Sequence, residues 1–173
     1  MVIVLLLLIP ALFGHIQRNF PYWREFGLGL RQNDSAAADF FKNHGLHGPI
    51  FNNYDIGGYL IFHLYPRERV FVDNRPEAYP ADFFQKTYIP MQESDEMWQR
   101  ADTKYGFNAV IFSWHDATPW GQQFLQTRVQ DPKWAPVFAD EHVIMFLKRN
   151  NANMRVIEHY EMPKSAFSVR AYQ

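Results

Sequence analysis

Residues 49–79 read PIFNNYDIGGYLIFHLYPRERVFVDNRPEAY, and this stretch decides the fold. A short apolar run at 49–51 is followed by a glycine pair, which opens an apolar segment over residues 57–64, and then by a second apolar run at 69–72. This order predicts a strand, a helix and a second strand. In a parallel sheet both strands would end at one edge, and doubly wound folds bind their ligands at that edge.

The remaining chain adds further helices and strands. Ser35 and the polar residues before it are good helix caps, Gly45 ends that helix, and Pro119 begins a later one. We predict further helical segments over residues 80–92 and 94–105, broken at Pro90, and strands at 108–113, 134–139 and 143–148. The fold class is therefore α/β. We expect a three-layer, Rossmann-like mixed sheet that is mostly parallel and ends in an antiparallel hairpin.

Composition narrows the function classes. The net charge of −1 disfavours a nucleic-acid partner, which would need a basic face. The absence of cysteine excludes disulfides, thiolate metal sites and a cysteine nucleophile. No G-x-G-x-x-G motif follows a strand, so dinucleotide binding is not supported. We predict no cofactor.

The N-terminus has the character of a membrane segment. Residues 1–13 are continuously apolar, and basic and aromatic residues follow, as at a membrane interface. A full span needs about 20 residues. We therefore predict that residues 1–18 are the last part of a transmembrane helix, that 19–32 form an interfacial linker, and that the chain is a fragment or shortened frame of a larger membrane protein. Residues 33–149 are the predicted soluble domain, and 150–173 a C-terminal tail that adds one strand or packs loosely.

Polar side chains follow three predicted strands. Their convergence on one sheet edge would make a binding site. Tyrosine and tryptophan side chains near the same edge, including Trp120, could stack on sugar rings. The predicted ligand-binding residues are Asn53, Tyr54, Asp55, Gly57, Gly58, Asp73, Asn74, Arg75, Tyr79, Trp114 and His115.

Structural roles compete with these assignments. Asp55 would equally cap a helix, Asp73 would pair with Arg75, and close helix packing requires glycine as often as phosphate binding does. A divalent cation held by Asp55, Asp73, His115 and Asp116 is a weaker alternative. Ser113 and His115 share a face, but without a G-x-S-x-G elbow a serine hydrolase is not favoured. No catalytic residue is assigned, and no metal site is predicted.

Residues 33–148 resemble the C-terminal extracytoplasmic domain of multi-spanning GT-C-like membrane glycosyltransferases, which use lipid-linked sugars. The matching residues are Ala38-Asp39-Phe40, the run from Phe51 to Leu60, and Val70-Phe71-Val72-Asp73-Asn74-Arg75 with Tyr79. Residues 53–57, NYDIG, are also distantly similar to the WWDYG motif of oligosaccharyltransferase catalytic subunits. The aspartate and the final glycine are kept, whereas both tryptophans are lost.

The resemblance implies an accessory domain without the catalytic loops, which lie between early membrane helices in that family. The domain would help to bind a polyprenyl-phosphate sugar donor or a glycan or peptide acceptor. It would lie on the extracytoplasmic (periplasmic) side, although Arg18, Arg24 and Arg31 favour the opposite orientation. Two alternatives remain, a non-catalytic membrane-anchored interaction module and a small metal-dependent enzyme. Whether the parent protein is an enzyme stays open.

Overall fold

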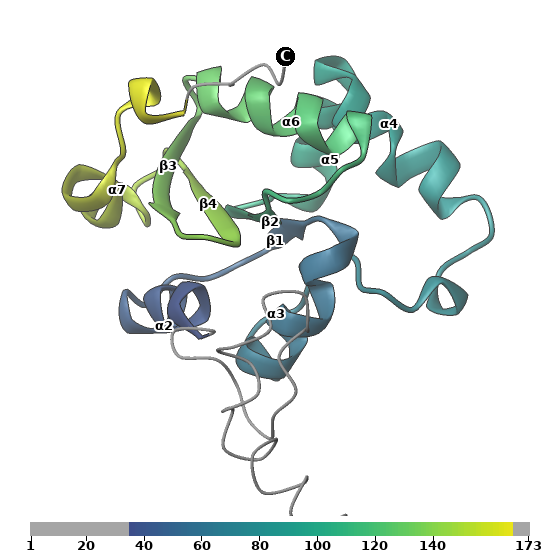
Figure 1. The fold of residues 1–173 in the computed structure, drawn as a ribbon, viewed down its shortest axis with the longest axis horizontal. Coiled ribbons are helices and arrows are strands. Elements are labelled where there is room, and N and C mark those ends of the chain that lie inside the picture. Colours follow the sequence, from purple (N-terminus) through teal and green to yellow (C-terminus); the bar gives the residue numbers. More distant parts are fainter. Residues whose placement is uncertain (1–34, 168–173) are drawn as a thin grey trace, which may run out of the picture. The chain divides into compact units, whose positions relative to one another are not determined.

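The computed structural model describes residues 35–167, which form a mixed α/β domain around one four-stranded sheet (Figure 1). The strands lie in the order β1-β2-β4-β3. Their bounds are β1, Ile50–Asn52; β2, Ala109–Ser113; β3, Trp134–Ala139; and β4, Val143–Lys148.

One strand pair is parallel and two are antiparallel. β1 and β2 are parallel, with Phe51 opposite Val110, whereas β4 is antiparallel to both β2 and β3. The predicted hairpin of β3 and β4 is confirmed. A mostly parallel sheet is wrong, because β4 returns from the hairpin and inserts beside β2. β3 becomes an edge strand, which suits Pro136, since proline cannot donate to a further strand.

Residues 69–72 do not form the predicted strand. They lie beside β1, but their backbone groups bind the Asn52 side chain and form no strand-to-strand hydrogen bonds with β1. Asn52 Oδ1 accepts from the Phe71 and Val72 N–H groups at 2.9 and 3.4 Å, and its Nδ2 donates to the Val72 carbonyl at 2.7 Å. The segment is thus attached to the sheet edge through one side-chain amide.

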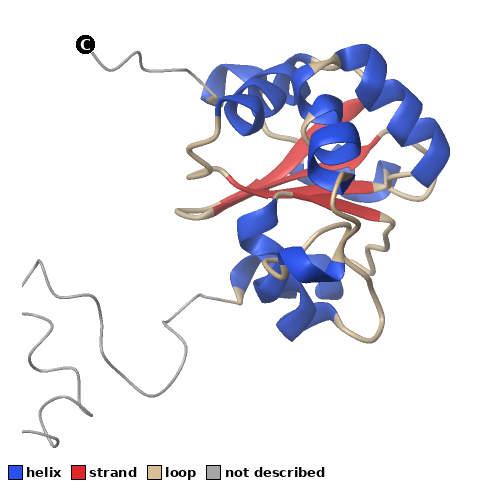
Figure 2. Ribbon diagram, turned by 90° about the vertical axis from the view of Figure 1, so that its right-hand side faces the viewer, coloured by secondary structure: helices blue, strands red, loops and turns tan. Residues whose placement is uncertain are grey.

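Helices cover both faces of the sheet (Figures 1 and 2). Helices α2 and α3 lie on one face and α4, α5 and α6 on the other. The bounds are α2, Ala36–Asn43; α3, Gly57–Leu64; α4, Pro90–Glu93; α5, Asp95–Tyr105; α6, Pro119–Gln130; and α7, Met154–Tyr160. Short helical turns lie at Tyr54–Ile56, Pro76–Ala78, Phe84–Tyr88 and Lys164–Ala166.

Local sequence accounts for several helix ends. The Ser94 hydroxyl accepts from the Met97 N–H at the start of α5, and Gly106 ends that helix with φ of 65°. Only glycine adopts this left-handed conformation without strain. Thr118 caps α6 by accepting from the Gly121 N–H, and Pro119 occupies its first turn, as the sequence predicts.

Residues 150–167 contain a helix instead of the predicted strand or loosely packed tail. In α7, Val156 and Ile157 are buried in the same hydrophobic cluster as α2 and α3. The buried Asn153 side chain donates to the Lys148 carbonyl and to the Asn108 carbonyl and side-chain oxygens. These contacts make α7 part of the folded domain.

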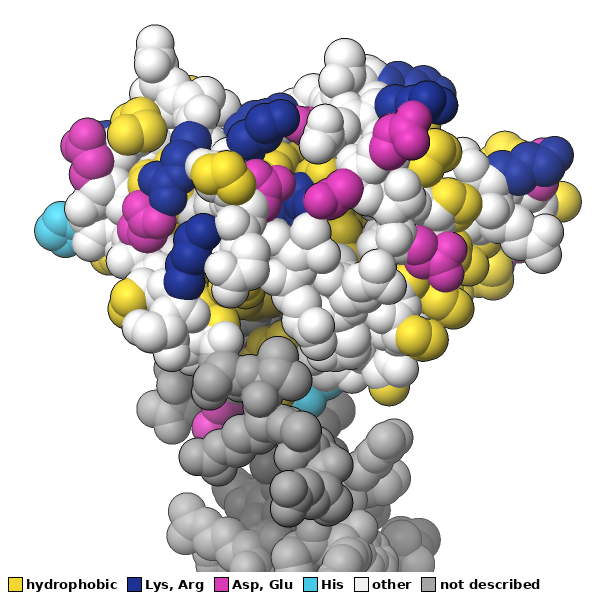
Figure 3. All heavy atoms as spheres, turned by 90° about the horizontal axis from the view of Figure 1, so that it is seen from above, with side chains coloured by type: hydrophobic (Ala, Val, Ile, Leu, Met, Phe, Trp, Pro, Cys, Tyr) yellow, Lys and Arg dark blue, Asp and Glu magenta, His cyan; other side chains and the backbone are white. Residues whose placement is uncertain are grey.

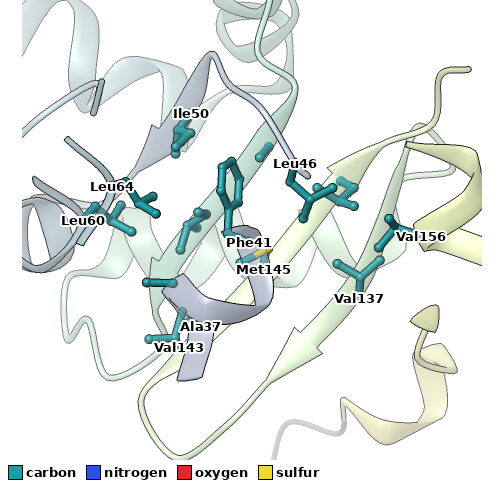
Figure 4. Packing of buried hydrophobic residues seen from close by; sticks show 14 of the residues in the cluster. Ala37, Phe41, Leu46, Ile50, Leu60, Leu64, Val137, Val143, Met145 and Val156 are labelled. Atoms are coloured by element: carbon teal, nitrogen blue, oxygen red, sulfur yellow. The ribbon is translucent and has the colours of Figure 1, made fainter. Parts of the chain in front are cut away.

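The two faces of the sheet have different cores. The cluster under α2, α3 and α7 is mainly aliphatic, with Leu46, Leu60, Met145 and Val156 around Phe41 (Figure 4). The cluster under α4, α5 and α6 is aromatic. Its centre is Phe51 of β1, whose ring lies 5.1 Å from Trp98 and 5.3 Å from Phe107.

The surface over α4, α5 and α6 mixes basic and acidic side chains (Figure 3). Among residues 35–167, no helix is long and apolar enough to cross a membrane. The predicted transmembrane helix and interfacial linker, residues 1–32, lie outside the described residues.

Candidate ligand-binding cleft

Two consecutive buried asparagines connect the end of β1 to the chain on either side of it. Asn52 binds residues 71 and 72, as described above. Asn53 reaches the end of β2. Its Oδ1 accepts from the Ser113 N–H at 2.9 Å, and its Nδ2 donates to Asp116 Oδ2 at 3.0 Å. The predicted convergence of these segments therefore depends on side-chain amides as well as on the sheet.

The Asp73 corner, residues 72–79, is built around one carboxylate. Asp73 is 4% exposed, and its oxygens accept three hydrogen bonds from Arg75, through the backbone N–H, Nε and Nη2. The Tyr79 hydroxyl accepts from the Asp73 N–H at 2.8 Å. These bonds from Arg75 lower the pKa of the Asp73 carboxyl below its ordinary value. Asn74 is exposed between the two paired residues.

The glycine pair at the start of α3 serves two different environments. A Cβ on Gly57 would lie 2.3 Å from the Val72 carbonyl oxygen and 2.5 Å from the Asp73 Cα, so the backbone of the Asp73 corner packs directly on this glycine. A Cβ on Gly58 would lie 3.4 Å from Asn74 Oδ1, at ordinary contact distance. Gly57 is therefore required for close packing, which was the structural alternative to a phosphate-binding role for the glycine pair.

A cleft of about 350 Å³ opens beside the ends of β1 and β2. Tyr54 and Asp55 follow β1 and form one side, and Asp116 follows β2. The aromatic Phe84, Tyr88 and Trp120 belong to the segments around them. Among residues 35–167, the lining consists of Tyr54, Asp55, Pro76, Phe84, Tyr88, Ile89, Asp116, Thr118 and Trp120.

The two carboxylates of the cleft are held differently. Asp116 is 5% exposed, and Asn53, the Thr118 N–H and the Thr118 hydroxyl all donate to it. Asp55 is exposed and has no hydrogen bond described for its side chain within residues 35–167. Partial burial, and then the charge of Asp116, raise the pKa of the Asp55 carboxyl. Asp55 is the carboxylate that a ligand can reach.

Aromatic rings join the cleft to the Asp73 corner. The Phe84 ring lies 5.8 Å from Tyr54, 5.6 Å from Tyr88 and 5.5 Å from Tyr79. Burial raises the pKa of the Tyr88 hydroxyl, so this group stays neutral. Its oxygen accepts a hydrogen bond from the Tyr54 N–H at 2.8 Å. The backbone of the Tyr54 wall is thereby fixed.

Trp114 and His115 turn toward the β3–β4 hairpin. The Trp114 indole N–H donates to the Asp140 carbonyl at 2.9 Å, and His115 Nε2 lies 2.7 Å from the Glu141 carbonyl oxygen. Neither residue lines the cleft. The third side of the cleft is formed by Asp116, Thr118 and Trp120 instead.

The four residues of the alternative metal site do not come together at one place. Asp55 and Asp116 share the cleft, Asp73 is bound to Arg75, and His115 faces the hairpin. In the part of the chain that the structure describes, no three histidine, aspartate or glutamate side chains gather in a way that could hold a metal ion.

The structure brings some predicted residues to the cleft and adds others. Tyr54 and Asp55 line it, whereas Asn53, Gly57, Asp73 and Tyr79 support its surroundings. Trp120, predicted to stack near this edge, and Asp116, predicted only as an alternative metal ligand, also line the cleft. The remaining lining residues were not predicted. They are Pro76, Phe84, Tyr88, Ile89 and Thr118. The aromatic density of residues 79–88 was the available signal, since four of these ten residues are tyrosine or phenylalanine.

Comparisons of the chain with models of known protein families, with curated proteins and with solved structures found no match. The resemblance to membrane glycosyltransferases therefore remains a prediction from the sequence.

Proposed function

We propose that residues 35–167 form the extracytoplasmic accessory domain of a GT-C-like membrane glycosyltransferase and hold a sugar-containing ligand in the cleft. The observation that carries this proposal is the combination of Asp55 and Asp116 with four aromatic side chains around one opening beside β1 and β2. Aromatic faces pack on the apolar face of a sugar ring, and carboxylates accept from its hydroxyls.

The negative charge of the cleft favours the sugar of a lipid-linked donor over its phosphate. Of the residues that the structure describes, two aspartates and no lysine or arginine line the cleft, so an anionic phosphate would meet like charge. The sugar of a polyprenyl-phosphate donor, or a glycan or peptide acceptor, fits the lining better than the phosphate. The cleft also lies beside the ends of the parallel strands β1 and β2, which is where α/β sheets commonly bind their ligands.

The domain contributes binding in this proposal, and catalytic groups would come from the membrane loops of the parent protein. The cleft of about 350 Å³ lies at the small end of the range for ligand pockets, enough for one or two sugar units. A non-catalytic interaction module remains the alternative function, and it would use the same cleft for a peptide.

Sugar binding can be measured through Trp120. Intrinsic fluorescence of the full chain in detergent would be titrated with methyl glycosides of mannose, glucose and galactose, and with a short-chain polyprenyl-phosphate mannose. We expect a saturable change in fluorescence with at least one sugar. Asp55→Asn should weaken the affinity for that sugar at least tenfold, and Trp120→Phe should abolish the fluorescence change.

The matched control is Asp82→Asn, which removes an exposed carboxylate that pairs with Lys86 outside the cleft. It should bind like the unaltered chain. If no sugar of the panel binds, or if Asp55→Asn and Asp82→Asn bind equally well, the sugar-binding proposal is wrong.

A further inference from the structure

The C-terminal end of α3 exposes two large aromatic side chains. Phe62 is 72% exposed and Tyr65 is 67% exposed, and they lie one helical turn apart. Among the described residues the next large exposed hydrophobic side chain is Trp114, at 42%, and its indole is held by the Asp140 carbonyl. An exposed aromatic pair on a domain with two well-packed cores indicates an interaction surface.

Two exposed arginines follow this pair in the chain. Arg67 and Arg69 are exposed, whereas the side chain of Glu68 between them is only 12% exposed. Its Oε1 lies 2.9 Å from His47 Nδ1, and its Oε2 accepts from the Gly48 N–H at 2.8 Å. The acidic residue is thus turned into the domain, and aromatic and arginine side chains remain on the outside.

We propose that this α3 tip, defined as Phe62, Tyr65, Arg67 and Arg69, lies in the headgroup layer of a membrane that contains anionic phospholipid. Aromatic rings are favoured at the boundary between headgroups and acyl chains. Arginines bind lipid phosphates while their apolar stems lie along the same boundary. The charge complementarity commits the surface to anionic lipid, since a neutral glycan or an apolar protein face would give the two arginines no partner.

The α3 tip and the cleft lie at opposite ends of α3. α3 runs from the Asp73 corner, where Gly57 begins it, to the α3 tip at its other end (Figure 1). Its eight residues span about 12 Å at 1.5 Å per residue. With the tip in the headgroups, this helix length separates the lipid contact from the beginning of α3, beside the cleft. The lipid contact does not depend on what the cleft binds.

The test places single fluorescent labels on the full chain. Because the chain contains no cysteine, one introduced cysteine carries the label. Phe62→Cys and Tyr65→Cys report on the α3 tip, and Gln126→Cys, at an exposed position of α6 on the other face of the sheet, is the matched control (Figure 1). Each labelled chain would be reconstituted into phosphatidylcholine vesicles, with or without phosphatidylglycerol, that contain spin-labelled quencher lipids.

We expect the labels at positions 62 and 65 to shift to the blue and to be quenched at least twofold more than the label at 126. Arg67→Glu combined with Arg69→Glu should reduce this quenching mainly in the phosphatidylglycerol vesicles. Lys104→Glu combined with Lys133→Glu makes the same charge change at exposed positions elsewhere and should leave it unaltered.

Equal quenching at positions 62 and 126 overturns the proposal. So does a blue shift at position 62 that rises with protein concentration in detergent without lipid, because the occupant would then be a second copy of the chain.

Discussion

Asp73 packs on Gly57, two residues after Asp55, yet the environments of the two aspartates differ. Asp73 is buried and accepts three hydrogen bonds from Arg75, and these bonds lower its pKa. Asp55 lies beside Asp116 in the cleft, largely exposed, and the partial loss of solvent around its carboxyl and then the neighbouring charge raise its pKa. A carboxylate that the fold stabilises is suited to hold structure, whereas one that the fold leaves without a partner is suited to meet a ligand.

This difference separates the Asp73 corner from the cleft, although the sequence presents both as polar residues after apolar runs. The corner is closed by its own backbone, which packs on Gly57. The cleft is open and lined by aromatic side chains. Four predictions test the comparison, from the largest expected effect on stability to the smallest.

Gly57→Ala should have the largest effect. The new Cβ would lie 2.3 Å from the Val72 carbonyl oxygen, and both neighbouring atoms belong to backbone that cannot rotate away. We expect the free energy of unfolding to fall by about 3 kcal/mol, at the upper end of the usual cost of overpacking. Denaturant unfolding of the full chain in detergent, followed by far-UV circular dichroism, measures it.

Gly58→Ala is the matched control one residue along the helix. Its Cβ would be at ordinary contact distance from Asn74, and alanine favours a helix by about 0.5–1 kcal/mol over glycine. It should be neutral or slightly stabilising. Equal losses for both variants would show that the Asp73 corner does not depend on close backbone packing.

Asp73→Asn should have the next largest effect. The amide would leave Arg75 without its carboxylate and place an N–H group against the guanidinium, so we expect a loss of about 1–3 kcal/mol. Because the folded pKa of Asp73 is lowered, the native carboxylate stabilises the fold above its unfolded pKa of about 4. The difference between the two proteins should therefore be full at neutral pH and disappear as the pH falls through the lowered folded pKa. The measurement is the thermal midpoint of both proteins over that pH range. A difference in midpoint that grew as the pH fell would contradict the prediction.

The described fold could be predicted well wherever local patterns decide it. The helix over residues 57–64 and both hairpin strands have the predicted bounds, because glycine, proline and short continuous apolar runs act over a few residues. Residues 69–72 have the composition of a strand but lack its ladder. The Asn52 amide satisfies their backbone groups first, and no periodicity reveals this.

The cleft was only partly predictable for a similar reason. Tyr54 and Asp55 follow a strand end and could be predicted from position alone. Trp114 also follows a strand end, but its direction depends on the Asp140 carbonyl, which lies 26 residues further along the chain. The aromatic walls come from residues 84–89, whose place beside β1 is set by the packing of a whole helical segment.

Asp55→Asn should have a small effect of the opposite sign. Its raised folded pKa means that the charged form is disfavoured in the folded protein, so the carboxylate weakens the fold above that pKa. The variant should be as stable as the unaltered chain at neutral pH or slightly more stable. We expect well under 1 kcal/mol, since solvent screens an exposed group. The gain should vanish below the unfolded pKa of about 4. A loss of stability at neutral pH would show that Asp55 has a structural role like that of Asp73.

The smallest expected effect is that of added Mg²⁺ or Mn²⁺. Asp55 and Asp116 are the only pair of predicted metal ligands that the described cleft brings together, and the Asp116 oxygens already accept from Asn53 and Thr118. A cation would have to displace those donors or be held by Asp55 and water. We therefore expect the thermal midpoint of the full chain to stay unchanged on addition of either ion. A ligand at about a hundred times its dissociation constant adds roughly 2.7 kcal/mol, which a melt would resolve. An upward shift that Asp55→Asn abolishes and Asp82→Asn retains would place a metal in the cleft and favour the metal-dependent enzyme over the sugar-binding domain.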